Sequence, residues 1–199
     1  MASRKHQLIE AAIDYLLEHG IADLSLRPLA AGIGTSARLL VFHFKSREGL
    51  IDDLLGEVQA RLQRSFVEIA TAESAEPLMK RFWRWATDKR NLPYLRLLYE
   101  AHFIAMQNPR AHQGYLARSS RGWVELIAAH LPPSIGGAAS ATLCGAAFDG
   151  LIIELLNTGD LARTTRALDH FIELLQREHQ ARSRAASARS RKRNSRTTP

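Results

Sequence analysis

Apolar residues recur at helical spacing through almost the whole of this 199-residue sequence, and this pattern restricts the possible folds most. The first such run places six apolar side chains on one face of a helix with about 3.6 residues per turn: Leu8, Ile9, Ala12, Ile13, Leu16 and Leu17. No stretch alternates apolar and polar residues between hairpin turns. The sequence therefore predicts an all-α fold of about nine helices.

Serine, proline and glycine residues indicate where the expected helices begin and end. The first helix stops at Gly20, and Ser25, Ser36 and Ser46 are placed to cap the next three, because a serine oxygen can accept from a free amide of the first turn. Farther along, prolines stand at or near the starts of the apolar runs. The later helices are expected near residues 76–90, 93–106, 111–131, 138–157 and 161–180.

The positive charge of the chain is concentrated at its carboxyl end. The sequence has 27 Lys and Arg residues against 20 Asp and Glu residues, which gives a net charge of +7. Residues 181–199 contain no acid and seven basic residues, so residues 1–180 are neutral overall; the seven are Arg182, Arg184, Arg189, Arg191, Lys192, Arg193 and Arg196. The same segment lacks large apolar side chains, which favours a disordered basic tail.

The amino-terminal helices carry the most informative motif. Two short helices separated by Gly32-Ile33-Gly34-Thr35 have the spacing of a helix-turn-helix. The run from Leu29 to Leu50 reads LAAGIGTSARLLVFHFKSREGL. It resembles the TetR family of bacterial transcriptional regulators, in which a Gly-x-Ser turn leads into a recognition helix that ends in His-Phe and is followed by Ser-Lys-Glu-x-Leu. The resemblance covers roughly residues 4–55.

The match to the family pattern needs no gap. Gly34 takes the place of the turn glycine, and His43-Phe44 takes the place of the closing pair. Two positions depart from the pattern: Val41 stands where the family usually has a tyrosine that contacts a phosphate, and Arg47 stands where it has a lysine. The resemblance implies a DNA-binding domain in residues 1–48 and an effector-binding and dimerisation domain in residues 49–180, followed by the tail of residues 181–199.

Arg38, early in the expected recognition helix, is the best candidate to read a base, because a guanidinium can pair bidentately with guanine. Leu39 and Phe42 are suited to thymine methyl groups, although Leu39 would equally suit packing beside Leu40. The hydroxyl and basic side chains are suited to phosphates, although on composition alone they would be ordinary solvated residues. The residues expected to contact DNA are Ser25, Arg27, Thr35, Ser36, Ala37, Arg38, Leu39, Phe42, His43, Lys45 and Arg47.

Aromatic residues are concentrated between residues 76 and 131, where the resemblance implies a small-molecule effector site. The candidates to line it are Phe82, Trp83, Tyr99, His102, Phe103, Trp123 and Asp149. For each of these residues taken alone, an ordinary core or surface role is the alternative.

Small residues alternate with large apolar ones near residues 138–157, and an apolar stripe follows on the last helix. This pattern suits a four-helix bundle between two copies, as the resemblance also implies. The candidate interface residues are Leu143, Ile153, Leu168, Phe171, Ile172 and Leu175. A two-fold dimer predicts a palindromic operator.

The sequence therefore predicts a homodimeric, ligand-responsive transcriptional regulator, more often a repressor in this family, that binds double-stranded operator DNA. The basic tail is expected to add sequence-independent attraction to DNA. A small helical enzyme and a helical protein-binding adaptor are the alternatives. No cofactor or metal is expected, because none of the eight histidines has an acid three residues before it; Cys144 lies in an apolar run typical of a buried thiol. The run from Leu131 to Phe148 contains prolines and glycines, so we expect no membrane span and a cytoplasmic protein.

Overall fold

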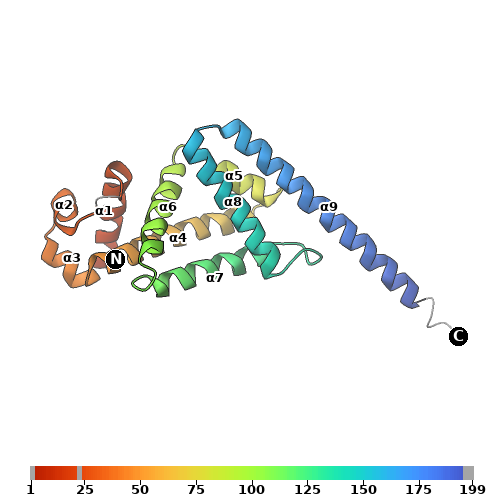
Figure 1. Cartoon of the computed structure of the whole chain (residues 1–199), viewed down its shortest axis with the longest axis horizontal. Helices are drawn as coiled ribbons and strands as arrows, with labels where there is room; N and C mark the ends of the chain where they lie inside the picture. Colours follow the sequence, from red (N-terminus) through yellow and green to blue (C-terminus); the bar gives the residue numbers. More distant parts are fainter. Residues whose placement is uncertain (1–2, 22–23, 195–199) are drawn as a thin grey trace. The chain divides into compact units, whose positions relative to one another are not determined.

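The computed structural model of the chain describes residues 3–21 and 24–194 (Figure 1). Within these ranges it has nine α-helices and no strand, which confirms the predicted fold class. The helices are α1 Arg4–His19, α2 Leu26–Gly32, α3 Ala37–Phe44, α4 Arg47–Thr71, α5 Leu78–Ala86, α6 Leu92–Gln107, α7 Gln113–Ala129, α8 Ala138–Thr158 and α9 Leu161–Asn194.

The helices form two compact units. Unit 1 comprises Met1–Glu68 and Trp85–Arg121, and therefore holds α1, α2, α3, α6, most of α4 and the first half of α7. Unit 2 comprises Ile69–Arg84 and Gly122–Pro199, and holds most of α5, the second half of α7, α8 and α9. This division differs from the boundary expected after residue 48, because α4 and α6 pack with the amino-terminal helices. The functional division of the chain stays a prediction.

The capping predictions are right at two serines and wrong at one. Ser36 Oγ accepts from the Leu39 amide at 3.2 Å, and Ser46 Oγ accepts from the Gly49 amide at 3.1 Å. Ser25 occupies the N-cap position of α2 but makes no hydrogen bond to the helix with its side chain. α5 also ends earlier than predicted, because Asn91 Nδ2 donates to the Trp85 carbonyl at 2.8 Å and closes a turn there.

The largest difference from the sequence prediction concerns the tail. α9 continues to Asn194, so residues 181–194 are helical where the sequence indicates disorder, and residues 195–199 lie outside the described residues. Alanine and arginine are good helix formers, and Arg182 Nε pairs with Glu178 Oε1 at 2.5 Å across one turn. This part of α9 extends beyond the other helices of unit 2 (Figure 1).

Unit 1 is built around an apolar core that α1, α2, α3 and α4 share. Two ion pairs at its surface connect α1 to α4. Lys5 Nζ lies 2.6 Å from Asp53 Oδ2, and the Arg61 guanidinium contacts the Glu10 carboxylate. Exposed pairs of this kind each contribute about 0–1 kcal/mol, so the burial of apolar side chains holds α1 on α4 and the ion pairs add to it.

The connection from α3 to α4 is unusually tight. Lys45 has φ +70° and ψ −47°, and the Ser46 amide donates to the Phe44 carbonyl at 2.8 Å, which closes a three-residue turn. Such a conformation costs on the order of 1–3 kcal/mol in a residue with a side chain. The turn brings the Phe44 carbonyl against α4, where a Cβ atom on Gly49 would lie only 2.1 Å from the carbonyl oxygen.

Unit 2 has an aromatic core between α5 and α8. The ring of Phe148 lies 5.0 Å from Phe82 and 5.7 Å from Trp83, measured between centroids. Trp83 Nε1 donates to Thr165 Oγ1 of α9 at 2.9 Å, so its indole N–H is satisfied although the residue is buried. Cys144 is buried as predicted, and burial raises the pKa of its thiol.

α8 is more exposed than its composition leads one to expect. Among the described residues it is the one helix long and apolar enough to cross a membrane by length and composition, a test that the core helix of a soluble protein also passes. Only 28% of its most apolar window is buried within the single chain. Most of this apolar surface therefore lies exposed in the single chain.

The contact between Gly49 and the Phe44 carbonyl predicts an unusual response to alanine. Gly49→Ala should lower the free energy of unfolding by about 1–3 kcal/mol, because the new methyl group would overlap a backbone oxygen that cannot easily move. Gly56→Ala on the same helix is the control, since no atom lies within 4 Å of the added Cβ. It should stabilise by about 0.5–1 kcal/mol through helix propensity. Urea denaturation measures both, and equal stability of the two variants would contradict the tight turn.

Candidate nucleic-acid interface

The turn between α2 and α3 is fixed by backbone hydrogen bonds that need a glycine. The Thr35 amide donates to the Ala30 carbonyl at 2.8 Å and the Gly34 amide to the Ala31 carbonyl at 3.3 Å. This pair of bonds is a Schellman motif, which places one residue in the left-handed region; Gly34 occupies it with φ +66°. The sequence prediction that Gly34 is the turn glycine is confirmed.

α2 is also held closely against α1. A Cβ atom on Gly32, the last residue of α2, would lie 2.2 Å from the ring of Tyr15. That ring is itself stacked on His19 with a centroid distance of 4.0 Å. The absence of a side chain at Gly32 therefore lets the end of α2 lie on α1, which fixes where the following turn and α3 begin.

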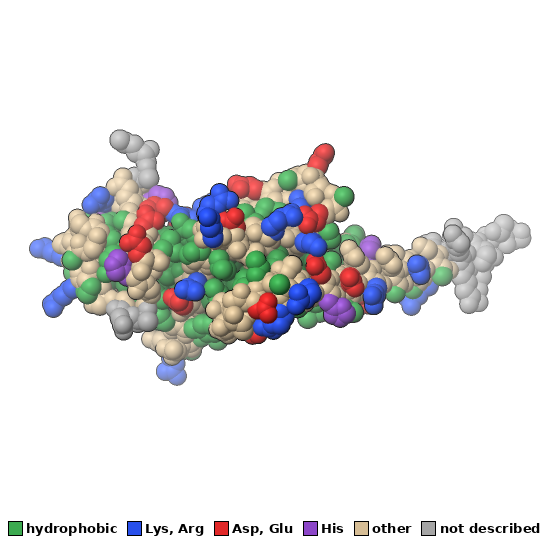
Figure 2. Space-filling model, turned by 90° about the horizontal axis from the view of Figure 1, so that it is seen from above, with side chains coloured by type: hydrophobic (Ala, Val, Ile, Leu, Met, Phe, Trp, Pro, Cys, Tyr) green, Lys and Arg blue, Asp and Glu red, His purple; other side chains and the backbone are tan. Residues whose placement is uncertain are grey.

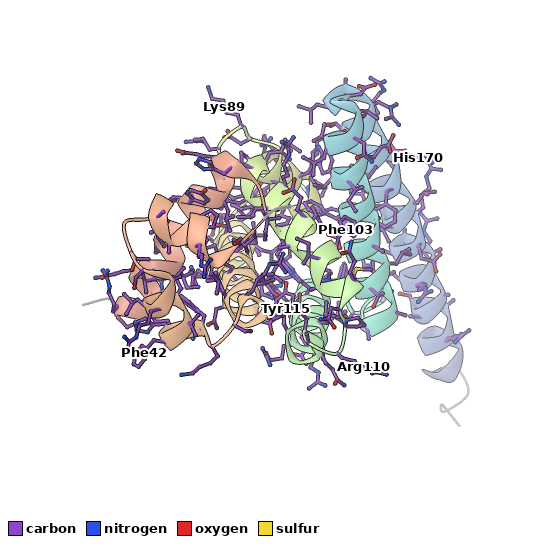
Figure 3. All side chains as sticks on the ribbon, turned by 60° about the vertical axis from the view of Figure 1, so that its left-hand side comes forward. Phe42, Lys89, Phe103, Arg110, Tyr115 and His170 are labelled. Atoms are coloured by element: carbon purple, nitrogen blue, oxygen red, sulfur yellow. The ribbon has the colours of Figure 1, made fainter. Side chains whose placement is uncertain are left out.

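α3 has one buried side and one exposed side. Leu40 and Phe44 are buried in the core of unit 1. The opposite side presents Arg38, Val41, Phe42 and Lys45, which follow the spacing of three, four and seven residues that defines one helix face. We call these four residues the α3 face. Phe42 is 68% exposed and Val41 is 44% exposed, and Figure 3 shows Phe42 directed away from the body of unit 1.

The residues predicted to contact DNA fall into two groups by exposure. The exposed group is Ser25, Arg27, Ser36, Arg38, Phe42 and Lys45, and the half-buried group is Thr35, Ala37, Leu39, His43 and Arg47. Arg27 and Arg38 make no hydrogen bond or ion pair within the described residues, so both guanidinium groups are available to a ligand. Figure 2 shows basic side chains that project at the end of unit 1 formed by α2 and α3.

Two of the predicted phosphate contacts already make hydrogen bonds within the chain. Lys45 Nζ donates to the Phe42 carbonyl at 3.1 Å and lies 5.6 Å from the centroid of the Phe42 ring. Arg47 Nε donates to the Leu24 carbonyl at 2.7 Å, which holds the segment before α2 against the start of α4. The departure from lysine at position 47 therefore has a structural reason, since a guanidinium can make this bond and still present other N–H groups.

The first turn of α4 carries a carboxylate whose negative charge is stabilised by hydrogen bonds. Glu48 lies in the first turn, and the hydrogen bond from its own backbone amide, followed by the one from Ser46, lowers the pKa of its carboxyl group. A carboxylate at this position is favoured by the helix dipole. It also places a negative charge beside Arg47, close to the α3 to α4 turn, and the phosphate contact of Arg47 stays a prediction.

Sequence reasoning missed Val41 as a member of the interface. The family pattern marks position 41 only as a departure from tyrosine, yet the valine side chain lies on the α3 face beside Phe42. The spacing does not decide the matter, because Val41 stands three residues after the exposed Arg38 and also three before the buried Phe44.

The aromatic effector candidates are divided between the units. Phe82, Trp83, Trp123 and Asp149 belong to unit 2, and Tyr99, His102 and Phe103 of α6 belong to unit 1. Phe82 and Trp83 are buried, whereas Phe103 is 49% exposed (Figure 3). Asp149 lies exposed on α8, so it is not embedded among the aromatic residues as the sequence suggested. The role of these seven residues in ligand binding stays a prediction.

The interface candidates on α8 and α9 require a partial correction. Leu168 is fully buried within the single chain, so a partner could not reach it, and Ile172, at 8% exposed, belongs mainly to the core. The apolar stripe on the last helix correctly predicted that these side chains are buried. It did not show whether the same chain or a partner covers them. Leu143 is 55% exposed, and Ile153, Phe171 and Leu175 are half-buried, so these four remain interface candidates.

One group of potential metal ligands was not expected from the sequence. His6, Glu10 and Glu57 have ligand atoms within 4.8 Å of one another in unit 1. Arg61 pairs with both carboxylates of this group. Because Arg61 and Arg64 already pair with these carboxylates, the arrangement is best described as an ion-pair network between α1 and α4.

The comparisons with known proteins agree with this geometry. Residues 8–54 match the family model described as bacterial regulatory proteins, tetR family. Residues 8–54 thus form the amino-terminal domain typical of the TetR family. This match confirms the resemblance noted in the sequence for the amino-terminal helix-turn-helix. No curated protein sequence matches the chain.

Solved structures show that the similarity of fold extends along most of the chain. A proposed TetR-family transcriptional regulator from Rhodococcus sp. is 22% identical with a TM-score of 0.72, over 88% of this chain and 99% of that one. The multidrug binding protein EbrR complexed with proflavin is 25% identical with a TM-score of 0.62, over 88% and 99%. A TetR-family member from Streptomyces coelicolor A3 is 24% identical with a TM-score of 0.62, over 88% and 98%.

Proposed function

We propose that this TetR-family regulator is a ligand-responsive repressor that binds a palindromic operator as a homodimer. The observation that carries the proposal is the α3 face, where Arg38 is exposed, unpaired within the described residues and presented by a helix whose other side is buried. A helix fixed in this way can enter a major groove, where Arg38 would pair with guanine O6 and N7. Arg27, Ser25 and Ser36 would contact phosphates or bases from α2 and the turn.

Dimerisation is supported by the exposed side of α8. Ala139, Leu143, Ala146 and Gly150 are spaced three or four residues apart, so they share a helix face of small and apolar residues that the single chain leaves largely uncovered. A second copy would cover this face by close approach of two helices. The two copies of α3 would then meet half-sites about 34–36 Å apart or at a related spacing.

Effector binding is supported by similarity to a protein with known ligands. EbrR is a multidrug binding protein that has been crystallised with ethidium and with proflavin, and its fold resembles that of this chain. We propose that a small molecule binds the helical domain that follows the helix-turn-helix. It would favour a conformation in which the two copies of α3 no longer match the half-sites. Operator affinity would fall by a factor set by how much more tightly the ligand binds this conformation than the one that binds DNA.

We therefore propose that the protein acts in the cytoplasm, where operator DNA is found. A protein interface also accounts for the apolar composition of α8 without a membrane. The alternatives of an enzyme and of a protein-binding adaptor have no particular observation in their favour, whereas the exposed Arg38 on the helix-turn-helix, unpaired within the described part of the chain, favours DNA.

Arg38→Ala tests the assignment of the base reader. Operators are first selected from random duplex DNA or from the region upstream of the gene, and affinity is measured by fluorescence anisotropy. The variant should lose about 1–3 kcal/mol of specific binding per half-site, because one bidentate contact is removed, while its thermal unfolding stays unchanged.

Arg110→Ala is the matched control, since Arg110 is an exposed arginine in the turn after α6 (Figure 3). It removes the same charge outside the helix-turn-helix and should bind the operator like the wild type. If Arg38→Ala also binds its operator as well as the wild type, the assignment of Arg38 is wrong.

Leu143→Glu tests the dimer. A carboxylate in the apolar face of α8 should weaken self-association by about tenfold or more, because it would be buried without a partner. Analytical ultracentrifugation measures the monomer fraction. Met106→Glu, at a residue 56% exposed on α6, is the control and should leave the dimer intact. A Leu143→Glu protein that stays as dimeric as the control would refute the α8 interface.

Removal of the tail tests its expected attraction to DNA. Deletion of residues 181–199 removes seven positive charges from each chain. It should weaken specific and non-specific binding alike. The slope of log K against log salt concentration should become less steep by about 0.9 for each phosphate that the protein no longer neutralises. A full-length variant with the seven basic residues replaced by glutamine separates charge from length. An unchanged salt dependence in both proteins would show that the tail does not contact DNA.

A further inference from the structure

The centre of the α3 face is apolar, although the face as a whole is basic. Val41 and Phe42 are adjacent and exposed, and Arg38 and Lys45 lie before and after them along the same face. In the family pattern a tyrosine at position 41 contacts a phosphate. Valine has no hydrogen-bonding group, so this chain cannot make that contact from position 41.

Neither apolar side chain is required by the packing of the chain. Leu40 and Phe44 supply the buried side of α3, and Phe42, at 68%, is the most exposed large apolar residue among those described. The Phe42 ring is accompanied by the Lys45 ammonium group, whose hydrogen bond to the Phe42 carbonyl keeps it above the ring. Val41 is β-branched and therefore has essentially one side-chain rotamer in a helix. The Val41 side chain is therefore restricted before any ligand binds, and the Lys45 ammonium group stays close to the Phe42 ring.

The positive charges of Arg38 and Lys45 favour a polyanionic partner such as DNA. The apolar side chains between them favour a base that presents an apolar group in the groove. In the major groove, the methyl group on C5 of thymine is the apolar group that a base pair ordinarily presents. Pressing Val41 or Phe42 against polar base edges would leave those edges without hydrogen bonds, which is unfavourable. Contact with a methyl group removes apolar surface from water on both sides.

We propose that Val41 and Phe42 read thymine methyl groups and that each operator half-site carries thymine beside the base contacted by Arg38. The inference rests on the proposed function, because it requires that α3 enter the major groove. It assigns to Val41 a role in sequence preference in place of the phosphate contact that tyrosine makes in the family pattern. Position 41 would then set the sequence that the protein selects, whereas a phosphate contact would add affinity to every sequence alike.

The test removes single methyl groups from the DNA. In the selected operator, each thymine is replaced in turn by uracil, which lacks the methyl group and keeps every hydrogen-bonding group of the base. The full-length wild-type protein should lose about fourfold in affinity at one or two thymines per half-site, as expected for one buried methyl group. At the other thymines the replacement should change affinity by less than about twofold.

Variants of the protein assign each methyl group to its side chain. Val41→Ala and Phe42→Ala should each lose the sensitivity to uracil at one position and keep it at the other. Val67→Ala is the matched control, because Val67 is 41% exposed on α4 and should leave the whole uracil profile unchanged. Circular dichroism verifies that each variant has the helix content of the wild type.

The outcomes separate this inference from the proposed function. If no uracil replacement weakens the wild type, or if both alanine variants keep the full wild-type profile, methyl readout is overturned while Arg38-dependent binding still supports the repressor. If the wild type selects no duplex at all, both proposals fail together.

Discussion

The burial of Leu40 and Phe44 is the interaction on which the interface depends. The two side chains lie four residues apart, and a helix that buries both has only one rotation about its axis available. Arg38, Val41, Phe42 and Lys45 are exposed because they stand on the other side of this same short helix. A helix of eight residues has little stability by itself, so the buried pair both anchors α3 and decides which side chains face the solvent.

The backbone on either side of α3 makes this anchoring specific. Before the helix, Gly34 adopts a positive φ that closes the turn, and Gly32 leaves space for the Tyr15 ring. After the helix, Lys45 adopts a strained conformation that brings the Phe44 carbonyl against Gly49. Gly32 and Gly49 permit close approaches that any Cβ atom would prevent. Because the turns at both ends of α3 are fixed, its exposed face has a fixed position. A helix that contacts base edges in a groove needs such a fixed position.

Most of the fold could be predicted from local signals. The period of the apolar residues identified the helices, and Ser36 and Gly34 located both sides of the turn, because caps and turns depend on residues a few positions apart. The two misjudged regions have different causes, one of long range and one local. Leu168 is a core residue rather than an interface residue, since its apolar stripe faces another helix of the same chain. Residues 181–194 are helical because alanine, arginine and short-range ion pairs support a helix even where few apolar contacts exist.

By itself, the sequence determined the all-α class, the turn at Gly34 and the identity of Arg38 as the candidate base reader, because each follows from spacing over one or two helical turns. Only the tertiary structure decided which residues are exposed. It placed Val41 on the outer face of α3, engaged Arg47 with the Leu24 carbonyl and left the apolar side of α8 uncovered. The physical reason is that exposure depends on which distant segments pack against a side chain, and a local pattern shows that a face is apolar but not what covers it.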